Sequence, residues 1–371
     1  MKNARCSTII FIAVSLFCIH SFGQVYTNHY SISNYWLQNE QSLYLHDGNI
    51  LMAGSKSLTT SDHDLLLVKI NTNTGDTMWT KTYSYPGIIL QNFSATELTD
   101  SDIIISSDYI DTATPTVTNY LFVLSVNSSG RENWAKVYNY PAPYTTFRPP
   151  LVRSIPNNEF WVVCTTFGTM GAVMIKMDHY GDTLVSKSVL IDSTDVNGGF
   201  LFNDLVQLNN ELYFTGSVEY AIDESHMFLL KTDTNGNIAW LKSDYYSRLF
   251  GADIGTNISA NKMMVTRDSQ LVIGLAQNGI GLLKTDTNGN ISWYNSLNDT
   301  FSSFTPPVLG DLTLTNDGGF LLTGYTDYSY ATGGTFNNTG KPFIARVDHA
   351  GNFLWGRKLS LIHISEPTRP Y

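Results

Sequence analysis

Two short acidic runs have residue types and spacing that could hold a metal ion. Asp233-Thr-Asn-Gly-Asn237 and Asp286-Thr-Asn-Gly-Asn290 place carboxylate and amide oxygens at alternate positions, and such oxygens suit a hard cation such as calcium. Neither run is followed by the glutamate that completes a helix-loop-helix calcium site. A hairpin turn explains both runs more simply, so we expect no metal at either run.

The densest polar cluster is Asp62-His63-Asp64, at the entry to an apolar run. It lacks a second histidine at metal-ligand spacing, so we expect a solvated turn there. The chain has no Gly-x-Ser-x-Gly, His-Glu-x-x-His or phosphate-binding glycine loop. We therefore assign no catalytic residue, metal or cofactor. Carboxylates that converge in a central channel, as in a glycosidase, stay an open alternative.

Aromatic and arginine side chains gather in long polar connections that could contact a partner. Such rings stack on sugars or anchor protein partners, although several could simply cover strand edges. The candidate binding residues are Tyr138, Tyr140, Tyr144, Phe147, Arg148, Tyr245, Tyr246, Arg248, Tyr328 and Tyr330.

The first 24 residues are typical of a secretory signal peptide. Lys2 and Arg5 precede an apolar run from Ile9 to Ile19, which is too short to span a bilayer. We therefore expect export without a transmembrane anchor, to the medium or the outer cell surface. Of three cysteines only Cys164 lies outside this segment, in an apolar run, and we expect it to be a buried hydrophobic residue rather than a nucleophile.

The last thirteen residues, 359–371, break the pattern of the rest of the chain. Leu359 to Arg369 resembles the in-frame translation of a transposase adapter used in preparing sequencing libraries. We therefore expect this tail to be an artefact, and we take no site residue from it.

Composition narrows the class of protein. The 371 residues are 43% hydrophobic, 13% aromatic and 15% charged, and the net charge is −10. These values exclude a disordered chain and a coiled coil. Because the chain is acidic and has no basic block, we expect neither nucleic acid nor an anionic membrane as a partner. We expect a monomer.

One unit recurs six times between the two ends: an apolar strand, a glycine turn, and in five copies a tryptophan four residues later. The third copy has Val185 in place of tryptophan. The turn glycines are Gly75, Gly130, Gly181, Gly236, Gly289 and Gly351, and the tryptophans are Trp79, Trp134, Trp240, Trp293 and Trp355. Internal repetition with a period near 54 residues fits a four-stranded unit.

Each copy also has an upstream hairpin, because a polar pair that tolerates positive φ precedes a second apolar strand. The pairs are Asp47-Gly48, Asp100-Ser101, Asn157-Asn158, Asn209-Asn210, Asp268-Ser269 and Asp317-Gly318. A further apolar alternation precedes each pair, so every copy supplies four strands and none has helical spacing.

Six such units predict an all-β fold, a β-propeller over residues 25–358, with each tryptophan at a contact between blades. Tyr26 to Tyr30 aligns with Trp79 to Tyr83 as a lone fourth strand. We therefore expect a seven-bladed propeller when complete. The short turns within blades share one face, and the longer, variable connections share the other, where function usually lies.

Two resemblances follow from these residues. Asn71 to Trp79 resembles the tryptophan-docking motif of quinoprotein propellers, although the adjacent cysteine pair of many quinoprotein dehydrogenases is absent. Residues 42–358 resemble the secreted β-propeller repeat proteins of Bacteroidetes, in Asp317 to Gly324 and in Phe343 to Gly351 followed by tryptophan. The second resemblance implies export by type IX secretion and no assigned activity.

We therefore expect a secreted, non-enzymatic propeller whose loop-lined face binds a glycan or an extracellular protein. One alternative is an extracellular enzyme, glycosidase or quinoprotein-like, with a channel active site or a catalytic domain beyond residue 358. Another is a periplasmic assembly scaffold.

Overall fold

The computed structural model describes residues 36–59, 62–111, 119–139, 150–166, 171–190, 200–221, 224–243, 258–277, 279–297, 308–326 and 341–358. The predicted signal segment, Tyr26 to Tyr30, and the tail 359–371 lie outside these residues. The chain divides into two compact units, Met1–Leu190 and Ile191–Tyr371. Each unit holds three four-stranded antiparallel sheets, and this confirms the predicted β-propeller fold.

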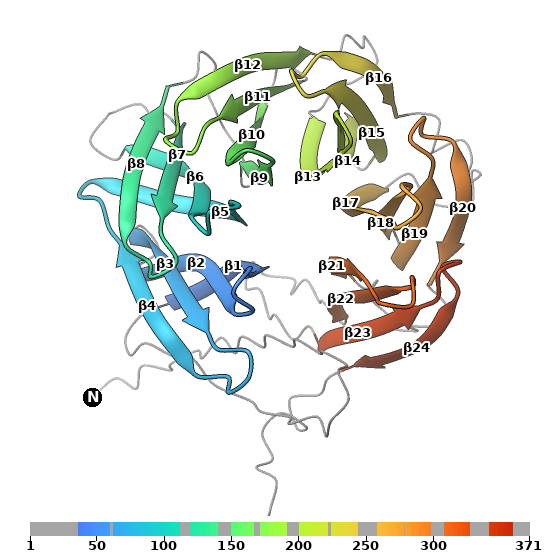
Figure 1. The fold of residues 1–371 in the computed structure, drawn as a ribbon, viewed down its shortest axis with the longest axis horizontal. Helices are drawn as coiled ribbons and strands as arrows, with labels where there is room; N and C mark the ends of the chain where they lie inside the picture. Colours follow the sequence, from blue (N-terminus) through green and yellow to red (C-terminus); the bar gives the residue numbers. More distant parts are fainter. Residues whose placement is uncertain are drawn as a thin grey trace, which may run out of the picture. The chain divides into compact units, whose positions relative to one another are not determined.

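The four strands of each sheet, or blade, pair side by side in chain order (Figure 1). In the first unit, blade 1 is β1 (Trp36–Tyr44), β2 (Ile50–Thr59), β3 (Asp62–Ile70) and β4 (Thr77–Tyr83); blade 2 is β5 (Ile88–Glu97), β6 (Ile103–Asp111), β7 (Asn119–Val126) and β8 (Glu132–Tyr138); blade 3 is β9 (Leu151–Ile155), β10 (Glu159–Thr166), β11 (Gly171–Met177) and β12 (Thr183–Leu190).

The second unit repeats this arrangement. Blade 4 is β13 (Phe200–Leu208), β14 (Glu211–Ala221), β15 (Glu224–Asp233) and β16 (Ile238–Lys242); blade 5 is β17 (Ser259–Val265), β18 (Leu271–Gln277), β19 (Gly279–Thr285) and β20 (Ile291–Ser296); blade 6 is β21 (Val308–Leu314), β22 (Phe320–Thr326), β23 (Lys341–Val347) and β24 (Phe353–Lys358). Within the described part of the chain there is no helix, and so none that could span a membrane.

The predicted polar pairs form the turns between first and second strands. A residue with positive φ occurs in every one of these turns, as the Asx-containing pairs predict. The residues are Gly48, Ser101, Asn157, Asn158, Asn209, Ser269 and Gly318. All six repeat glycines, in the turns between third and fourth strands, also have positive φ, from 72° to 81°.

The hydrophobic core lies between neighbouring blades. Ile103 and Ile105 of β6 pack into a cluster shared with blade 1, whereas Ile104 packs into a cluster shared with blade 3. A strand that is covered on both faces needs apolar side chains at successive positions. This explains why the second strands read as continuous apolar runs instead of alternating ones.

Candidate functional site

Each unit presents two edges that differ in how their residues are used. We call the turns that join strands one and two, and strands three and four, the turn edge. We call the connections from the second strand to the third, and from the fourth strand to the next blade, the loop edge. Antiparallel pairing places each set at its own end of the strands.

The turn edge carries one ion pair in five of the six blades. A base near the end of the third strand reaches an acid in or beside the first turn. The pairs are Lys69 with Asp47 at 2.5 Å, Lys176 with Glu159 at 2.5 Å, Lys231 with Glu211 at 2.7 Å, Lys284 with Asp268 at 2.8 Å, and Arg346 with Asp317. The bases are largely buried, so their charges need these partners.

Blade 2 keeps an acid at this turn but replaces the base with neutral groups. Ser125 stands where the other blades have a base, since it pairs across the sheet with Trp134 as Lys69 does with Trp79. The amide of Asn133 donates to the carboxylate of Asp102 at 2.8 Å and to the hydroxyl of Ser125 at 3.3 Å. The turn acid is therefore satisfied in blade 2 as well.

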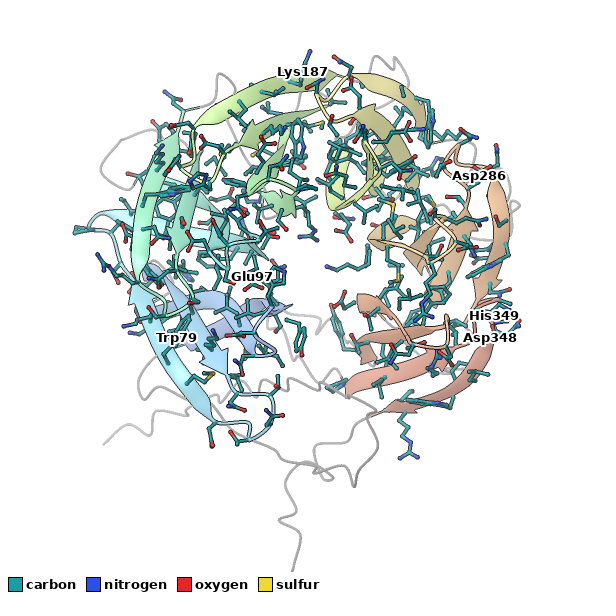
Figure 2. All side chains as sticks on the ribbon, in the orientation of Figure 1. Trp79, Glu97, Lys187, Asp286, Asp348 and His349 are labelled. Carbon is teal, nitrogen blue, oxygen red and sulfur yellow. The ribbon has the colours of Figure 1, made fainter. Side chains whose placement is uncertain are left out.

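The acidic runs that resemble calcium loops use their carboxylates inside their own turns. Asp286 Oδ1 accepts hydrogen bonds from the backbone amides of Asn288 and Asn290, and Oδ2 accepts one from the Asn290 side chain. Asp233 and Asp348 have equivalent bonds, and Asp286 and Asp348 are labelled in Figure 2. Burial raises the pKa of Asp286, but these bonds outweigh it and lower the pKa overall. The hairpin interpretation of the two runs is confirmed.

The repeat tryptophans dock on the turn of the following blade. Trp79 (Figure 2) donates its indole N–H to the Ser128 carbonyl at 3.3 Å, and Trp134 donates to the His179 carbonyl at 2.9 Å. The rings lie so close to the turn glycines that a Cβ at Gly181 would stand 2.7 Å from Trp134. Trp293 covers Gly351 in the same way. The predicted blade-to-blade role of these three tryptophans is confirmed.

The first strands of neighbouring blades are joined by side chains. Gln41 donates from its amide to the Ala95 carbonyl at 3.0 Å and accepts from the Ala95 amide at 2.6 Å. In the second unit, Asp204 accepts from the Met263 amide at 2.9 Å. Gln41 and Asp204 each directly follow a β-bulge. A bulge re-aims side chains, and here the side chains of Gln41 and Asp204 bond to the backbone of the first strand of the next blade.

A buried carboxylate lies toward the loop edge of blade 2. Asp108 is only 1% exposed, and its Oδ2 accepts a hydrogen bond of 2.6 Å from the side chain of Asn92. Asn92 has a φ of 58° and lies in the bulge of β5. Asn92 thus combines a left-handed backbone conformation with a direct hydrogen bond to a buried carboxylate.

Cys164, in contrast, is fully buried on β10, as the sequence predicts. Burial, followed by the nearby charge of Asp108, raises the pKa of its thiol well above the usual value. A thiol in this state does not act as a nucleophile.

Of the ten candidate binding residues only Tyr138 lies within the described residues. It is the last residue of β8 rather than part of a loop, and its hydroxyl donates to the Gly181 carbonyl at 2.5 Å. This half-buried ring is therefore part of the contact between blades 2 and 3. Tyr140, Tyr144, Phe147, Arg148, Tyr245, Tyr246, Arg248, Tyr328 and Tyr330 lie outside the described residues.

The run Asp62-His63-Asp64 is the start of β3 and not a solvated turn. Asp62 pairs with Thr59 and Asp64 pairs with Lys56, so the hairpin between β2 and β3 is tighter than the sequence suggested. His63 and Asp64 are half-buried. Among the described residues no group of three or more His, Cys, Asp or Glu side chains could hold a metal ion.

Sequence reasoning missed the ion pairs and the pairing of Asn92 with Asp108. The ion pairs had a signal, because a base recurs at one repeat position and an acid at another in five copies. The pairing of Asn92 with Asp108 had no signal in the sequence, since a β-bulge that reorients one asparagine side chain has no fixed sequence pattern.

No protein-family model and no curated protein sequence matches this chain. Several solved structures do. An ulvan lyase from a new polysaccharide lyase family aligns with a TM-score of 0.58 and 10% identity, over 88% of this chain and 86% of its own. The NanB sialidase of Streptococcus pneumoniae aligns with a TM-score of 0.52 and 8% identity, over 78% and 65%.

A protein of unknown function from Bacteroides caccae aligns with a TM-score of 0.49 and 12% identity, over 85% of this chain and 95% of its own. At their identities, the lyase and the sialidase support the β-propeller fold and nothing beyond it.

Proposed function

We propose that this chain is an exported, non-enzymatic β-propeller protein that binds a glycan or an extracellular protein on its loop edge. The observation that carries this proposal is that the polar groups of the turn edge already have partners within the protein. Its acids are held by the adjacent bases and turn amides, and three of its glycines lie under the tryptophans of preceding blades. Groups that already have partners are poor ligand donors.

The loop edge differs from the turn edge because its connections are not uniform. Its connections differ widely in length: residues 327–340 separate β22 from β23, whereas residue 278 alone separates β18 from β19. Variable connections on a rigid scaffold are where binding residues concentrate. Nine of the ten candidate aromatic and arginine residues belong to such connections.

Glycans are the first ligands to test, because the solved structures similar to this chain with TM-scores above 0.5 include a polysaccharide lyase and a sialidase. The test compares wild type with the variant Tyr140→Ala/Tyr144→Ala/Tyr246→Ala on a glycan array and on host cells. The control is Tyr44→Ala/Tyr180→Ala, because these turn-edge tyrosines are 54% and 61% exposed. Loss of retention in the triple variant alone supports the proposal. Equal retention of all three proteins contradicts it.

The export part of the proposal rests on the residues before Val25 and on the resemblance to secreted Bacteroidetes repeat proteins. Expression in a bacterium that has type IX secretion, followed by amino-terminal sequencing of protein from the medium, tests it. A mature chain that starts near Val25 is the expected result. A full-length chain retained inside the cell would contradict export.

The buried carboxylate of Asp108 favours a second candidate, an enzyme that acts on polysaccharides. A buried carboxyl group near the loop edge can donate or accept a proton in general acid–base catalysis. Incubation of wild type and Asp108→Asn with a polysaccharide panel tests this function. Product release by wild type that falls at least 100-fold in the variant would establish the enzyme, and the absence of product would leave the binding proposal in place.

A further inference from the structure

One position on the first strands has the same structural role in blades 1, 2 and 4. It is the first paired residue after the β-bulge, and we call it the bridge position. Its side chain accepts a hydrogen bond from a backbone amide on the first strand of the next blade. The bonds join Gln41 to the Ala95 amide at 2.6 Å, Ser94 to the Val152 amide at 3.2 Å, and Asp204 to the Met263 amide at 2.9 Å. A residue with this role must therefore carry an acceptor.

Lys262 occupies the bridge position of blade 5 and cannot fill this role. It is the first paired residue after the bulge of β17, and a lysine side chain has donors but no acceptor. The equivalent amide on β21 belongs to Leu312, and it donates to the carboxylate of Asp311 on its own strand at 2.9 Å. The amine of Lys262 is therefore not needed to join the first strands.

Lys262 also differs from the other bases in having no partner. Among the lysines and arginines of the described ranges, it alone is half-buried and takes part in no ion pair, hydrogen bond or ring contact. The largely buried bases of the turn edge each have an acid instead. A charge that loses part of its hydration without gaining a partner is unfavourable. An anion from a ligand would supply what the protein does not.

The backbone around Lys262 is held by blade 6. Lys262 pairs across the sheet with Gly274, and a Cβ at Gly274 would meet Leu309 of blade 6. Because directly opposite residues of an antiparallel pair lie on the same face, Lys262 lies on the side of blade 5 that faces blade 6. Asn261, the bulge residue before it, donates to the Leu309 carbonyl at 3.3 Å. The position of the lysine is thus fixed before any ligand binds.

The charges near Lys262 restrict the kind of anion. Asp204 and Asp311 follow the bulges of the two neighbouring first strands, and the whole chain has a net charge of −10. These charges repel a ligand with many closely spaced charges, such as a polysulfate. A glycan whose carboxylates are separated by neutral sugars avoids most of this repulsion.

Lys262 is also within reach of a ligand at the loop edge. β17 begins at Ser259, directly after a loop-edge connection. Lys262 lies three residues further on, which is about 10 Å along a strand. A sugar chain held by the loop edge can therefore extend one carboxylate to the amine.

We propose that Lys262 binds a carboxylate of an acidic glycan, one whose uronic acids are separated by neutral sugars. The ammonium group donates charge-assisted hydrogen bonds to the carboxylate oxygens. This inference rests on the proposed binding function and deepens it, because it names the charge of the ligand and the residue that recognises it.

A glycan array tests the inference when each uronic acid glycan is paired with its carboxyl-reduced counterpart. Wild type should bind the acidic member at least about tenfold more tightly than the reduced one, the effect of one charge-assisted hydrogen bond. Lys262→Gln should lose this preference, and Lys262→Arg, which keeps the charge, should retain it. The matched control is Arg267→Gln, which removes the same charge from an exposed turn-edge residue of blade 5 and should behave as wild type.

The outcomes separate this inference from the proposed function. Equal binding of acidic and reduced glycans by wild type, or an unchanged preference in Lys262→Gln, would overturn the inference and leave glycan binding in place. Retention of wild type on no glycan would overturn the inference and restrict the proposed function to a protein ligand. Urea denaturation adds a measurement without ligand. Lys262→Gln should have the same midpoint as wild type, and a lower midpoint would show that the amine has a structural role instead.

Discussion

The indole nitrogen of Trp134 donates to the carbonyl of His179 at 2.9 Å, and the same ring lies against Gly181. One residue of blade 2 thereby fixes the hairpin of blade 3. The turn must carry glycine because its φ is 78° and because the ring occupies the position of a Cβ. The tryptophan and the glycine of successive repeats therefore constrain each other.

Replacing Trp134 should cost more stability than replacing the equivalent tryptophan of blade 6. Trp134→Ala removes a half-buried ring and its hydrogen bond, so we expect the free energy of unfolding to fall by about 2–3 kcal/mol. Trp355 is 43% exposed, and Trp355→Ala should cost less than about 1 kcal/mol. Urea denaturation followed by circular dichroism measures both. Equal losses would contradict the docking role.

A side chain at Gly181 should be tolerated worse than one at Gly87. Both glycines have φ near 78°, but a Cβ at Gly87 meets nothing within 4 Å, whereas one at Gly181 meets Trp134 and the Tyr138 hydroxyl below 3 Å. Gly87→Ala should therefore cost about 1 kcal/mol, the conformational part alone. Gly181→Ala should lower the free energy of unfolding by at least about 1 kcal/mol more than Gly87→Ala does. This additional loss should be smaller when Gly181→Ala is introduced into the Trp134→Ala variant, because the clashing ring is then absent. Thermal and urea unfolding of five proteins test this: wild type, Gly87→Ala, Gly181→Ala, Trp134→Ala and the double variant Trp134→Ala/Gly181→Ala.

The repeat made the fold predictable, whereas the irregular features escaped prediction. The Gly181 turn and the Trp134 contact recur in the sequence at fixed spacing, so strand order and blade contacts follow from alignment of the copies. The left-handed φ of Asn92 comes from a bulge, which depends on the packing of the first strands and not on a local pattern. Tyr138 is predicted to lie in a loop, yet its pairing with Leu121 extends β8 through it.

The turn acids should make the second unit sensitive to acid. Hydrogen bonds from Lys231 and Tyr213 lower the pKa of Glu211, and those from Lys284 and Thr266 lower the pKa of Asp268. A carboxyl whose folded-state pKa is depressed stabilises the protein above its unfolded pKa, about 4. That stability is lost as the pH falls through the folded-state value.

Urea midpoints of wild type and Glu211→Gln/Asp268→Asn between pH 7 and pH 2.5 measure this contribution. Wild type should be more stable than the variant at pH 7, and the difference should shrink below about pH 4. The gain at pH 7 should be modest, since both carboxylates are partly exposed. A difference that is constant with pH would show that the loss is due to packing.

The thiol of Cys164 should report on global unfolding. It is fully buried, and burial raises its pKa, so both access and thiolate formation are suppressed in the folded chain. In the variant Cys6→Ser/Cys18→Ser, native protein at pH 8 should react with a thiol reagent at least 100-fold more slowly than protein in denaturant. Rapid labelling without denaturant would mean that blade 3 opens locally.

Gln41→Glu should destabilise the contact between blades 1 and 2 in a pH-dependent way. The Gln41 amide both donates to and accepts from the backbone of Ala95. An ionised glutamate can accept but not donate, and its charge faces the Ala95 carbonyl, so we expect a loss of about 1–2 kcal/mol at pH 7. The repulsion should raise the folded-state pKa of the new carboxyl above the unfolded value of about 4.3.

A carboxyl whose pKa is raised in the folded state destabilises the protein when the pH is above that pKa. The destabilisation decreases as the pH falls and the carboxyl becomes protonated. The protonated acid can again donate to the Ala95 carbonyl. The difference in unfolding free energy between wild type and Gln41→Glu should therefore narrow between about pH 6 and pH 4, where wild type is still folded. Gln41→Leu, which cannot titrate, should show a constant loss over the same range. If both variants behave alike, the paired hydrogen bonds between Gln41 and Ala95 do not join the first strands.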